Sequence, residues 1–488
     1  MSDLQDYLND PERDGLVDDV RKKIDTLEID AIYYQYISIT GRIMGKMIPA
    51  RHWERSAREG MQTWIGGVAN VFADRDGNLI GFPPNASELL ALPDPETFCQ
   101  LPWNKRVARV FCTVFFSRED PERPEEFLDS DSRGNLRRIH DTFREDHDGL
   151  HMRVGCEPEM LWLKPGDGEK PYYETTKPYA YHIDQFEQLE EVWLKLYEYG
   201  IAMGLDMIQA DHEDAPGMIE MNFQYDDALR TSDRLTTYRQ LCAQVARECG
   251  LIAVFMSKPY MSLSGNGCHH NLSLWRGGED TVQSLGRQGQ PAMDDVFTYR
   301  EGGTNEFENP NHAWMPSELG RHALGGMLAH LNALVAIGSS TVNSYRRLND
   351  TGLWAPVGAG WGLQNRSCAV RVSSPDRLEF RCVDSMVNPY LMQAALLKAM
   401  DDGIRNRIDP GEPEDRNFVD LLNAGEDIER IPTTLRDSLD ALADDDVIKS
   451  ALPGDLYRVY DWYKRDEWNK FIWQVSDWDV NMYLDCLP

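Results

Sequence analysis

Two glutamates lie inside an apolar, strand-like segment, HMRVGCEPEMLWL, and this arrangement constrains the fold more than any other feature of the chain. Side chains alternate between the two faces of a strand, so Glu157 and Glu159 point to the same face. Two carboxylates about 6–7 Å apart on a half-buried face repel each other and are costly to remove from water. A divalent cation offsets both costs, and oxygen ligands suit Mg²⁺ or Mn²⁺. The alternative is an exposed strand face with solvated acids, because a single ExE pair in so acidic a chain is a weak signal.

Similar groups recur in three later segments. Glu213 and Glu220 flank a Pro-Gly turn in HEDAPGMIE, which allows the chain to bring them together. His269 follows a glycine-rich turn in GNGCHHNLSL, and Glu379 lies in the strand-like RLEFRCVD. Each has a structural explanation when taken alone, but five glutamates and one histidine on candidate strands together predict a metal site. Arginines with fork geometry for carboxylates and phosphates accompany them: Arg347, Arg366, Arg371, Arg377 and Arg381.

The hydrophobic patterning predicts an α+β fold with two domains. An acidic, Pro-containing stretch from 117 to 134 separates a small N-terminal domain, residues 1–120, from a larger region, residues 121–488. The strands are expected at 31–39, 64–74, 106–116, 151–163, 216–227, 267–275, 368–374 and 377–384. The helices are expected at 1–30, 186–204, 235–250, 324–338 and 388–404, with a helical C-terminal part.

Composition excludes some classes of partner. The chain has 488 residues, with 50 Lys and Arg against 81 Asp and Glu, for a net charge of −31. Recognition of phosphate backbones and of anionic membranes depends on clustered positive charge, so neither nucleic acid nor a membrane is expected as a partner. The N-terminus, MSDLQDYLND, lacks the features of a signal peptide, and the nine cysteines form no CxxC pair. We expect a cytoplasmic protein.

Six motifs occur in the order in which the glutamine synthetase family has them: GCEPEM, HEDAPGMIE, KPYMSLSGNGCHHNLSL, NSYRRL, NRSCAVRV and LEFRCVDSMVNPYL. On these motifs the chain resembles that family from about residue 20 to its end. The resemblance implies a β-grasp-like N-terminal domain and a catalytic domain with a curved antiparallel sheet flanked by helices. It implies ATP-dependent amide formation at the γ-carboxyl of glutamate, through γ-glutamyl phosphate, with two or three Mg²⁺ or Mn²⁺ ions per site. It also implies stacked rings of six subunits, with active sites between neighbours.

The resemblance assigns roles residue by residue. The ligands of one ion would be Glu159, Glu213 and Glu220, and those of the second Glu157, His269 and Glu379. Glutamate would be bound by Gly265, Arg347, Arg366 and Arg381. ATP would be bound by Tyr225, Asn271, Ser273, Arg371 and Arg377, where Asn271 replaces a family histidine. The catalytic candidates are Glu213 and Arg366. Of these two, Arg366 would neutralise the charge of the transferring phosphoryl group.

The chain departs from the family where ammonium is bound. The family uses an Asp from the neighbouring subunit and a Glu on a flap, and alignment places Ser38 and Trp354 at these positions. Tyr179 would remain at the wall of the pocket. Losing two acids weakens the attraction for a cation, and a Trp ring offers a large apolar wall. Both changes fit a bulky or aromatic amine that is neutral at pH 7, such as aniline, the acceptor of the family's γ-glutamylanilide synthases.

Two other interpretations stay open. An ordinary glutamine synthetase would use ammonia, with its acid supplied from elsewhere, for example by Asp350, if the flap alignment is shifted by one residue. A catalytically silent relative would serve as a structural or binding protein. The silent alternative is disfavoured because all six predicted metal ligands are present, and buried acids without a function destabilise a protein.

Overall fold

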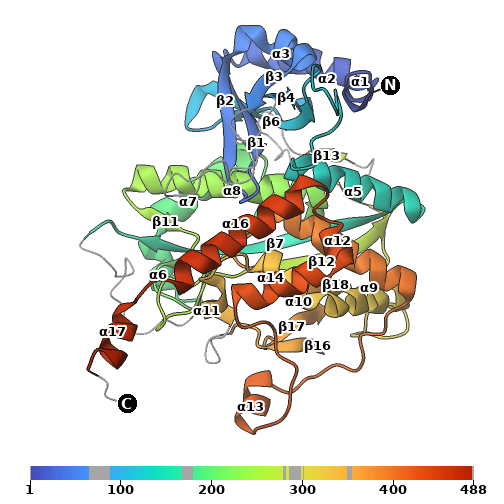
Figure 1. Cartoon of the computed structure of the whole chain (residues 1–488). Helices are drawn as coiled ribbons and strands as arrows, with labels where there is room; N and C mark the ends of the chain where they lie inside the picture. The colour runs from blue at the N-terminus through green and yellow to red at the C-terminus, as the bar shows by residue number, and fades with distance from the viewer. Residues whose placement is uncertain are drawn as a thin grey trace.

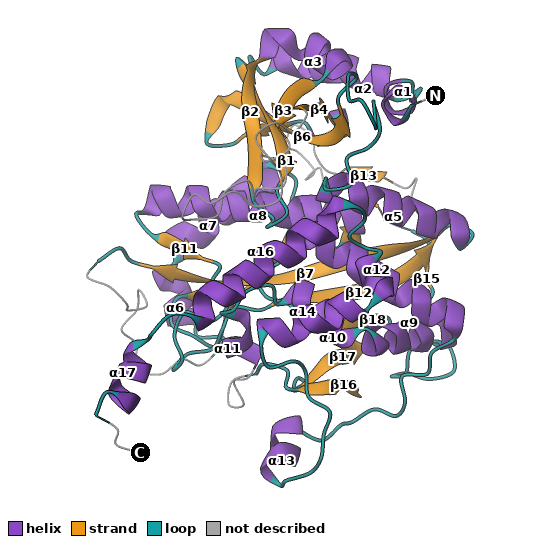
Figure 2. Cartoon of the chain, in the orientation of Figure 1, coloured by secondary structure: helices purple, strands orange, loops and turns teal. Residues whose placement is uncertain are grey.

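The computed structural model describes residues 2–64, 88–166, 180–278, 282–284, 298–300, 302–348 and 354–485. Two sheets organise this part of the chain, a six-stranded one near the N-terminus and a ten-stranded one in the larger region (Figure 1). Helices pack around both sheets (Figure 2). The predicted α+β class, with a large sheet flanked by helices, is therefore confirmed.

The N-terminal sheet has the strand order β2-β1-β6-β4-β3, with β5 paired to β6. Strand β1 runs parallel to β6, and the other pairs are antiparallel. The sequence predicts one helix before this sheet, but the structure has two, because Pro11 lies between them and disfavours helical geometry in the residue before it. The elements are α1 (Asp3–Leu8), α2 (Arg13–Thr26), β1 (Ala31–Ile37), β2 (Ile43–Pro49), α3 (Trp53–Glu59), β3 (Met61–Trp64), β4 (Glu88–Pro93), β5 (Cys99–Leu101) and β6 (Asn104–Phe116).

Between β6 and the next helix, the chain forms turns and one isolated bridge, Phe115 to Phe127. The division of the chain at residue 120 stays a prediction. Most of the strand predicted at 64–74 lies outside the described residues.

The larger sheet has the strand order β16-β17-β18-β12-β7-β9-β8. Strand β12 pairs antiparallel with β7 from Cys268 opposite Pro158 to Arg276 opposite Leu150. Strand β7 is buried along most of its length, and its half-buried positions include Glu157. The strands are β7 (Leu150–Leu163), β8 (Met207–His212), β9 (Met218–Phe223), β10 (Asp226–Asp227), β11 (Ile252–Val254), β12 (Cys268–Arg276), β13 (Val282–Ser284), β14 (Thr298–Arg300), β15 (Thr304–Asn305), β16 (Gly358–Leu363), β17 (Cys368–Ser374) and β18 (Arg377–Phe380).

Helices α5 and α8 pack against β7, and α12 packs against α5, α8 and α9. The helix predicted at 324–338 is two helices that meet at His330, whose ring nitrogens contact Asp402 (3.1 Å) and Asp445 (2.7 Å). The helices are α5 (Ser132–Asp146), α6 (Ile183–Gln188), α7 (Glu190–Ala202), α8 (Ala228–Cys249), α9 (Glu318–Ala329), α10 (Leu331–Gly338), α11 (Ser344–Leu348), α12 (Pro389–Asn406), α13 (Phe418–Asn423), α14 (Leu435–Asp444), α15 (Asp446–Lys449), α16 (Asp455–Ile472) and α17 (Asp477–Tyr483).

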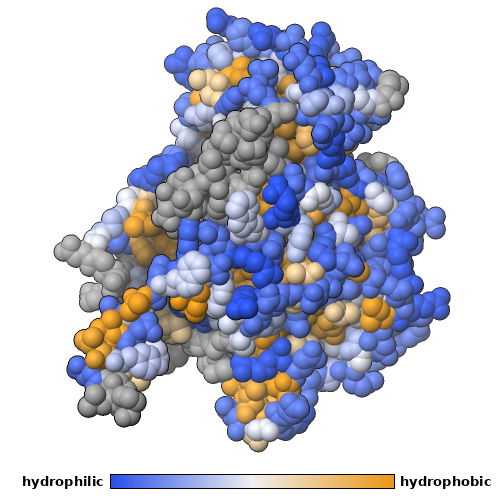
Figure 3. Space-filling view, viewed as in Figure 1, coloured by the Kyte–Doolittle hydropathy of each residue, from blue (hydrophilic) through white to orange (hydrophobic). Residues whose placement is uncertain are grey.

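The surface in Figure 3 is mostly hydrophilic, with apolar side chains gathered beside the C-terminal end of the chain. Trp473, Val475 and Leu484 are the most exposed of these, at 79%, 80% and 76%. Within the described part of the chain, every helix is too short or too polar to cross a membrane.

Candidate active site

A cavity of about 790 Å³ opens along strands β7, β9, β12 and β18 of the larger sheet. All predicted metal, glutamate and nucleotide residues line this cavity, and so does Trp354. These residues are Glu157, Glu159, Glu213, Glu220, His269, Glu379, Gly265, Arg347, Arg366, Arg381, Tyr225, Asn271, Ser273, Arg371 and Arg377. Segments more than 200 residues apart in the sequence therefore meet in one place.

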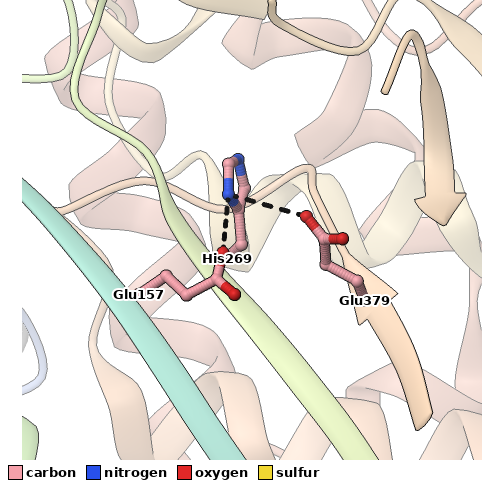
Figure 4. A group of neighbouring side chains, drawn as sticks. All are labelled: Glu157, His269 and Glu379. Atoms are coloured by element: carbon pink, nitrogen blue, oxygen red, sulfur yellow. Dashed lines mark hydrogen bonds and ion pairs between the residues drawn. The ribbon is translucent and has the colours of Figure 1, made fainter. Parts of the chain in front are cut away.

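Glu157, His269 and Glu379 form the first acidic cluster of the cavity (Figure 4). His269 on β12 lies directly opposite Glu157 on β7, and Asn271 lies opposite Glu379 on β18. The Nδ1 atom of His269 is 3.3 Å from Glu157 Oε2 and 3.7 Å from Glu379 Oε1. One potential ligand atom from each residue lies within 4.8 Å of the others, which is close enough to share one cation.

Asp211, Glu213 and Glu220 form the second acidic cluster, with the same 4.8 Å spacing between potential ligand atoms. Asp211 on β8 lies opposite Glu220 on β9, and Glu220 in turn lies opposite Glu159 on β7. Glu159 lies between the two clusters: its Oε1 is 4.0 Å from His269 Nδ1, and its Oε2 accepts a hydrogen bond from the Gly267 amide (2.6 Å). Asp211 is not among the metal ligands predicted from the sequence, although it stands two residues before Glu213, the same spacing as Glu157 and Glu159.

The carboxylates of these clusters repel one another. Burial raises the pKa of Glu220 well above its ordinary value, and the charges of Glu157, Glu159 and Glu213 raise it further. Burial and the neighbouring acids, Glu159 foremost, raise the pKa of Glu213 to about 8. Burial also raises the pKa of Glu159, although Arg347 lies close to it. The carboxylate oxygens of this site can ligate a metal ion, and their mutual repulsion is relieved when a cation binds. Both properties fit divalent ions such as Mg²⁺ or Mn²⁺.

Arginines line the cavity beside the acids. Arg347 is 4% exposed, its Nη2 lies 3.1 Å from His269 Nε2, and its Nη1 donates to the Val383 carbonyl (3.3 Å). Arg371 Nη1 donates to Glu379 Oε2 (2.8 Å), and Arg381 pairs with the same carboxylate. These cations give part of the cavity the charge and fork geometry that bind carboxylates and phosphates.

Gly265 is required by the packing of Arg347. A Cβ atom at this position would lie 2.5 Å from the Ser257 carbonyl oxygen and 3.2 Å from Arg347 Cγ. The family resemblance implies that Gly265 lets the backbone approach glutamate. The structure shows that the space of the missing side chain is occupied by the chain itself.

The predicted nucleotide residues lie around an aromatic pair. The rings of Tyr225 and Trp275 are 6.2 Å apart and inclined by 30°, and the Arg153 guanidinium lies 4.3 Å from the Trp275 ring. Asn271 Nδ2 donates to Glu157 Oε1 (2.8 Å), whereas its Oδ1 is buried without a hydrogen-bond partner in the described chain. Ser273 Oγ accepts a hydrogen bond from Trp275 Nε1 (2.8 Å). An orphaned polar atom beside flat rings fits a ligand with both a planar and a polar part.

Trp354 lies at the cavity with an exposed indole, 63% accessible. Its indole Nε1 donates to Asp214 Oδ2 (2.9 Å), and its carbonyl accepts from Arg381 Nη2 (3.1 Å). The Arg366 guanidinium lies 5.9 Å from the ring, within the range of a cation–π contact. The backbone of Trp354 has a φ of 60°, in the left-handed region that residues other than glycine rarely adopt.

Tyr181 and Ile208, which are not among the predicted site residues, also line the cavity. Tyr181 is 68% exposed and Ile208 is 57% exposed. Ile208 lies in no predicted motif, whereas Tyr181 stands two residues after Tyr179, the residue predicted for the wall of the pocket. With Trp354, they give the cavity an apolar surface in addition to its charged one.

Ser38, another residue of the predicted amine pocket, does not line this cavity. Ser38 is fully buried in the turn between β1 and β2, where its Oγ accepts from the Arg42 amide (3.0 Å) and lies 3.1 Å from Thr40 Oγ1. A side chain with no exposed surface has nothing to present to a neighbouring subunit, so this placement does not support Ser38 as a wall of the pocket. Tyr179 and Asp350 lie outside the described residues.

Comparison with known proteins places the chain in a family. The model of the family described as "Glutamine synthetase, catalytic domain" matches residues 129–303 and 297–483. A glutamine synthetase of Rhizobium meliloti (strain 1021) is 32% identical over 460 residues, which cover 92% of this chain and 95% of the relative. A glutamate–methylamine ligase of Methyloversatilis universalis is 32% identical over 473 residues, covering 94% and 97%. A solved structure titled "GmaS/ADP complex-Conformation 1" matches with a TM-score of 0.81 and 30% identity, covering 96% of this chain and 99% of the other. The chain therefore belongs to the glutamine synthetase family and is an ATP-dependent ligase that joins glutamate to an amine.

Proposed function

We propose that this enzyme ligates the γ-carboxyl of glutamate to an amine with an apolar substituent, an aromatic amine such as aniline, rather than to ammonia. The observation that carries the proposal is the exposed indole of Trp354 at the cavity, 63% accessible and fixed at both its ring and its backbone. Tyr181 and Ile208 extend this apolar surface. A flat, neutral acceptor can stack on such a surface and bury its apolar part there, whereas ammonia has no apolar part to bury.

The reaction proceeds in two steps. The terminal phosphoryl group of ATP passes to the γ-carboxyl of glutamate, and ADP leaves. The amine nitrogen then attacks the carbonyl carbon, the bond from carbon to the phosphate oxygen breaks, and the proton released by the amine leaves with phosphate. Bound divalent ions would supply charge neutralisation for the phosphates, held by the two acidic clusters.

The arginines act on the substrates in this scheme. Arg347 and Arg381 bind the carboxylates of glutamate through their forked guanidinium groups. Arg366 stabilises the negative charge that develops on the transferring phosphoryl group. Tyr225, Asn271 and Ser273 hold the adenosine part, and Arg371 and Arg377 contact the nucleotide phosphates. The presence of all these residues around one cavity disfavours the catalytically silent alternative.

The relatives support a substituted amine in part. One relative is named for methylamine, a primary amine that carries an apolar group. The second candidate function, glutamine synthesis from ammonia, is favoured by the equally similar relative named glutamine synthetase. An aromatic amine is the acceptor that the Trp354 and Tyr181 rings favour over both.

Phosphate release from ATP and glutamate, measured with ammonia, methylamine and aniline, tests the proposal. We expect the highest kcat/KM with aniline. Trp354→Ala is expected to lower the aniline value about tenfold, which corresponds to about 1.4 kcal/mol. Trp354→Glu is expected to shift preference toward ammonia, and Arg366→Ala is a control that loses turnover with every acceptor. If ammonia is the best acceptor of the unchanged enzyme, the aromatic assignment is wrong.

Stacked rings of six subunits, with active sites completed by neighbours, are also a proposal. The large apolar side chains exposed near the C-terminus, among them Trp473 and Leu484, support burial in an assembly. Light scattering on the purified protein gives the molar mass that tests this, since 12 chains of 55.9 kDa are expected.

A further inference from the structure

We propose that Asp214 is a specificity-determining residue of this ligase, which holds the Trp354 indole in place and thereby sets the preference for an apolar amine. This inference rests on the proposed function, because it explains how the acceptor wall is kept in place. Asp214 immediately follows Glu213 of the second acidic cluster, and it lines the cavity.

A single carboxylate oxygen of Asp214 joins three segments of the chain. Its Oδ2 accepts hydrogen bonds from Trp354 Nε1 and from Ser264 Oγ, both at 2.9 Å. The two donors are 140 and 50 residues away in the sequence. Asp214 lies between β8 and β9, Ser264 precedes β12, and Trp354 precedes β16. The Asp214 carboxylate therefore connects the segment before β16, which carries Trp354, to the loop between β8 and β9.

An exposed indole needs such a contact if it is to form a defined wall. A side chain that is 63% exposed otherwise keeps its rotamer freedom, and a mobile ring gives little stacking energy to a bound amine. The hydrogen bond from Arg381 holds the carbonyl of Trp354, whereas the bond to Asp214 holds the indole itself. With its N–H fixed at Asp214 and its ring near Arg366, the indole presents one defined orientation.

A rival role for Asp214 is direct attraction of a cationic acceptor. The two roles predict different activities for the variants Asp214→Asn and Asp214→Ala. An asparagine keeps an oxygen that can accept both hydrogen bonds but carries no charge. If Asp214 acts by positioning, Asp214→Asn retains the acceptor preference and Asp214→Ala loses it. If it acts through its charge, both variants lose activity with ammonia and methylamine more than with aniline.

The orientation of the indole can be measured without any acceptor. We suggest ¹⁹F NMR of the full-length protein labelled with 5-fluorotryptophan, with the Trp354 signal identified among the 13 tryptophans by its absence in Trp354→Phe. The Trp354 signal is expected to shift in Asp214→Ala and to stay in place in Asp214→Asn. An unchanged signal in Asp214→Ala would overturn the inference, whatever the acceptor proves to be.

Kinetics test the consequence for specificity. The ratio of kcat/KM for aniline to that for ammonia is expected to fall about tenfold in Asp214→Ala, with the KM for glutamate within about twofold. Trp354→Phe keeps an aromatic ring but loses the N–H, so it is expected to lower the ratio as well, and the double variant no further. Ser264→Ala is the matched control, because it removes the other donor and leaves the indole bond.

The outcomes separate this inference from the proposed function. An unchanged ratio in Asp214→Ala, or a double variant in which the two effects add, would overturn the role of Asp214 in specificity. A wild-type enzyme that prefers ammonia would overturn the proposed aromatic acceptor, while the NMR result would still decide whether Asp214 orients the indole.

Discussion

Glu213→Gln is expected to stabilise the metal-free protein while abolishing ligation. Burial and repulsion from Glu159 and Asp211 raise the pKa of Glu213 from 4.5 to about 8. Glutamine has a similar shape and no charge, so it removes the repulsion and also removes a predicted metal ligand. Stability and activity are therefore expected to change in opposite directions.

The magnitude follows from proton linkage. Because the folded-state pKa of Glu213 lies above the unfolded value, folding is favoured most below about pH 4.5, and this contribution is lost as pH rises through about 8. A rise of the pKa from 4.5 to about 8 corresponds to about 5 kcal/mol of unfolding free energy. Glu213→Gln is therefore expected to raise the free energy of unfolding, relative to the wild type, by less than about 1 kcal/mol at about pH 5 and by about 5 kcal/mol above pH 8.

Urea unfolding in the presence of EDTA, at about pH 5 and about pH 8.5, measures this difference. Glu198→Gln, on the exposed side of α7, is the matched control and is expected to leave the midpoint unchanged at both pH values. Added Mg²⁺ should stabilise the wild type and not Glu213→Gln. If Glu213→Gln has the same midpoint as the wild type at the higher pH, the acids do not repel as described, and the argument for a metal site fails with them.

Two further predictions concern His140, which is outside the cavity lining, and Gly267, which is next to Glu159. Burial lowers the pKa of His140 to about 4, and its Nε2 accepts the Met152 amide, so the ring is neutral when folded. The neutral ring contributes fully to the free energy of unfolding above about pH 6.5, and this contribution falls by about 3 kcal/mol as the pH drops to about 4. His140→Gln should therefore make the free energy of unfolding, measured with urea, less dependent on pH between about 6.5 and about 4. An unchanged pH dependence in this range would contradict the prediction. Gly267→Ala places a methyl group 3.0 Å from Glu159 Oε1, so we expect a higher KM for Mg²⁺ and at least tenfold lower kcat/KM for glutamate; normal kinetics with Mg²⁺ would show that the cluster tolerates displacement.

Local rules predicted the acid-bearing strands β7, β9 and β18, but not β8, which carries Asp211. The alternation of β7 predicts that Glu157 and Glu159 share a face, and both line the cavity beside His269. Asp211 and Glu213 repeat the spacing of Glu157 and Glu159, but Glu213 lies one residue beyond the end of β8, so strand alternation alone does not assign Asp211 to the second cluster.

Other features depend on contacts that sequence does not encode locally. Asp214 meets Ser264 and Trp354 only because three distant segments converge, so nothing in HEDAP indicates its partners. For Ser38 the alignment predicts a pocket residue, and the structure adds a local contact, the hydrogen bond from the Arg42 amide within the turn, that the alignment does not indicate. The two helices α9 and α10 meet at His330, whose ring contacts two acids distant in sequence, Asp402 and Asp445.

The left-handed backbone at Trp354 has a consequence for the evolution and engineering of this enzyme. An L side chain at φ of 60° costs about 1–2 kcal/mol, which glycine does not incur. A library selected for heat tolerance alone would therefore enrich glycine at position 354, and the aromatic wall would vanish with it. The indole is thus kept at the cavity at a cost in stability, and this cost would be similar for most other side chains placed on this backbone.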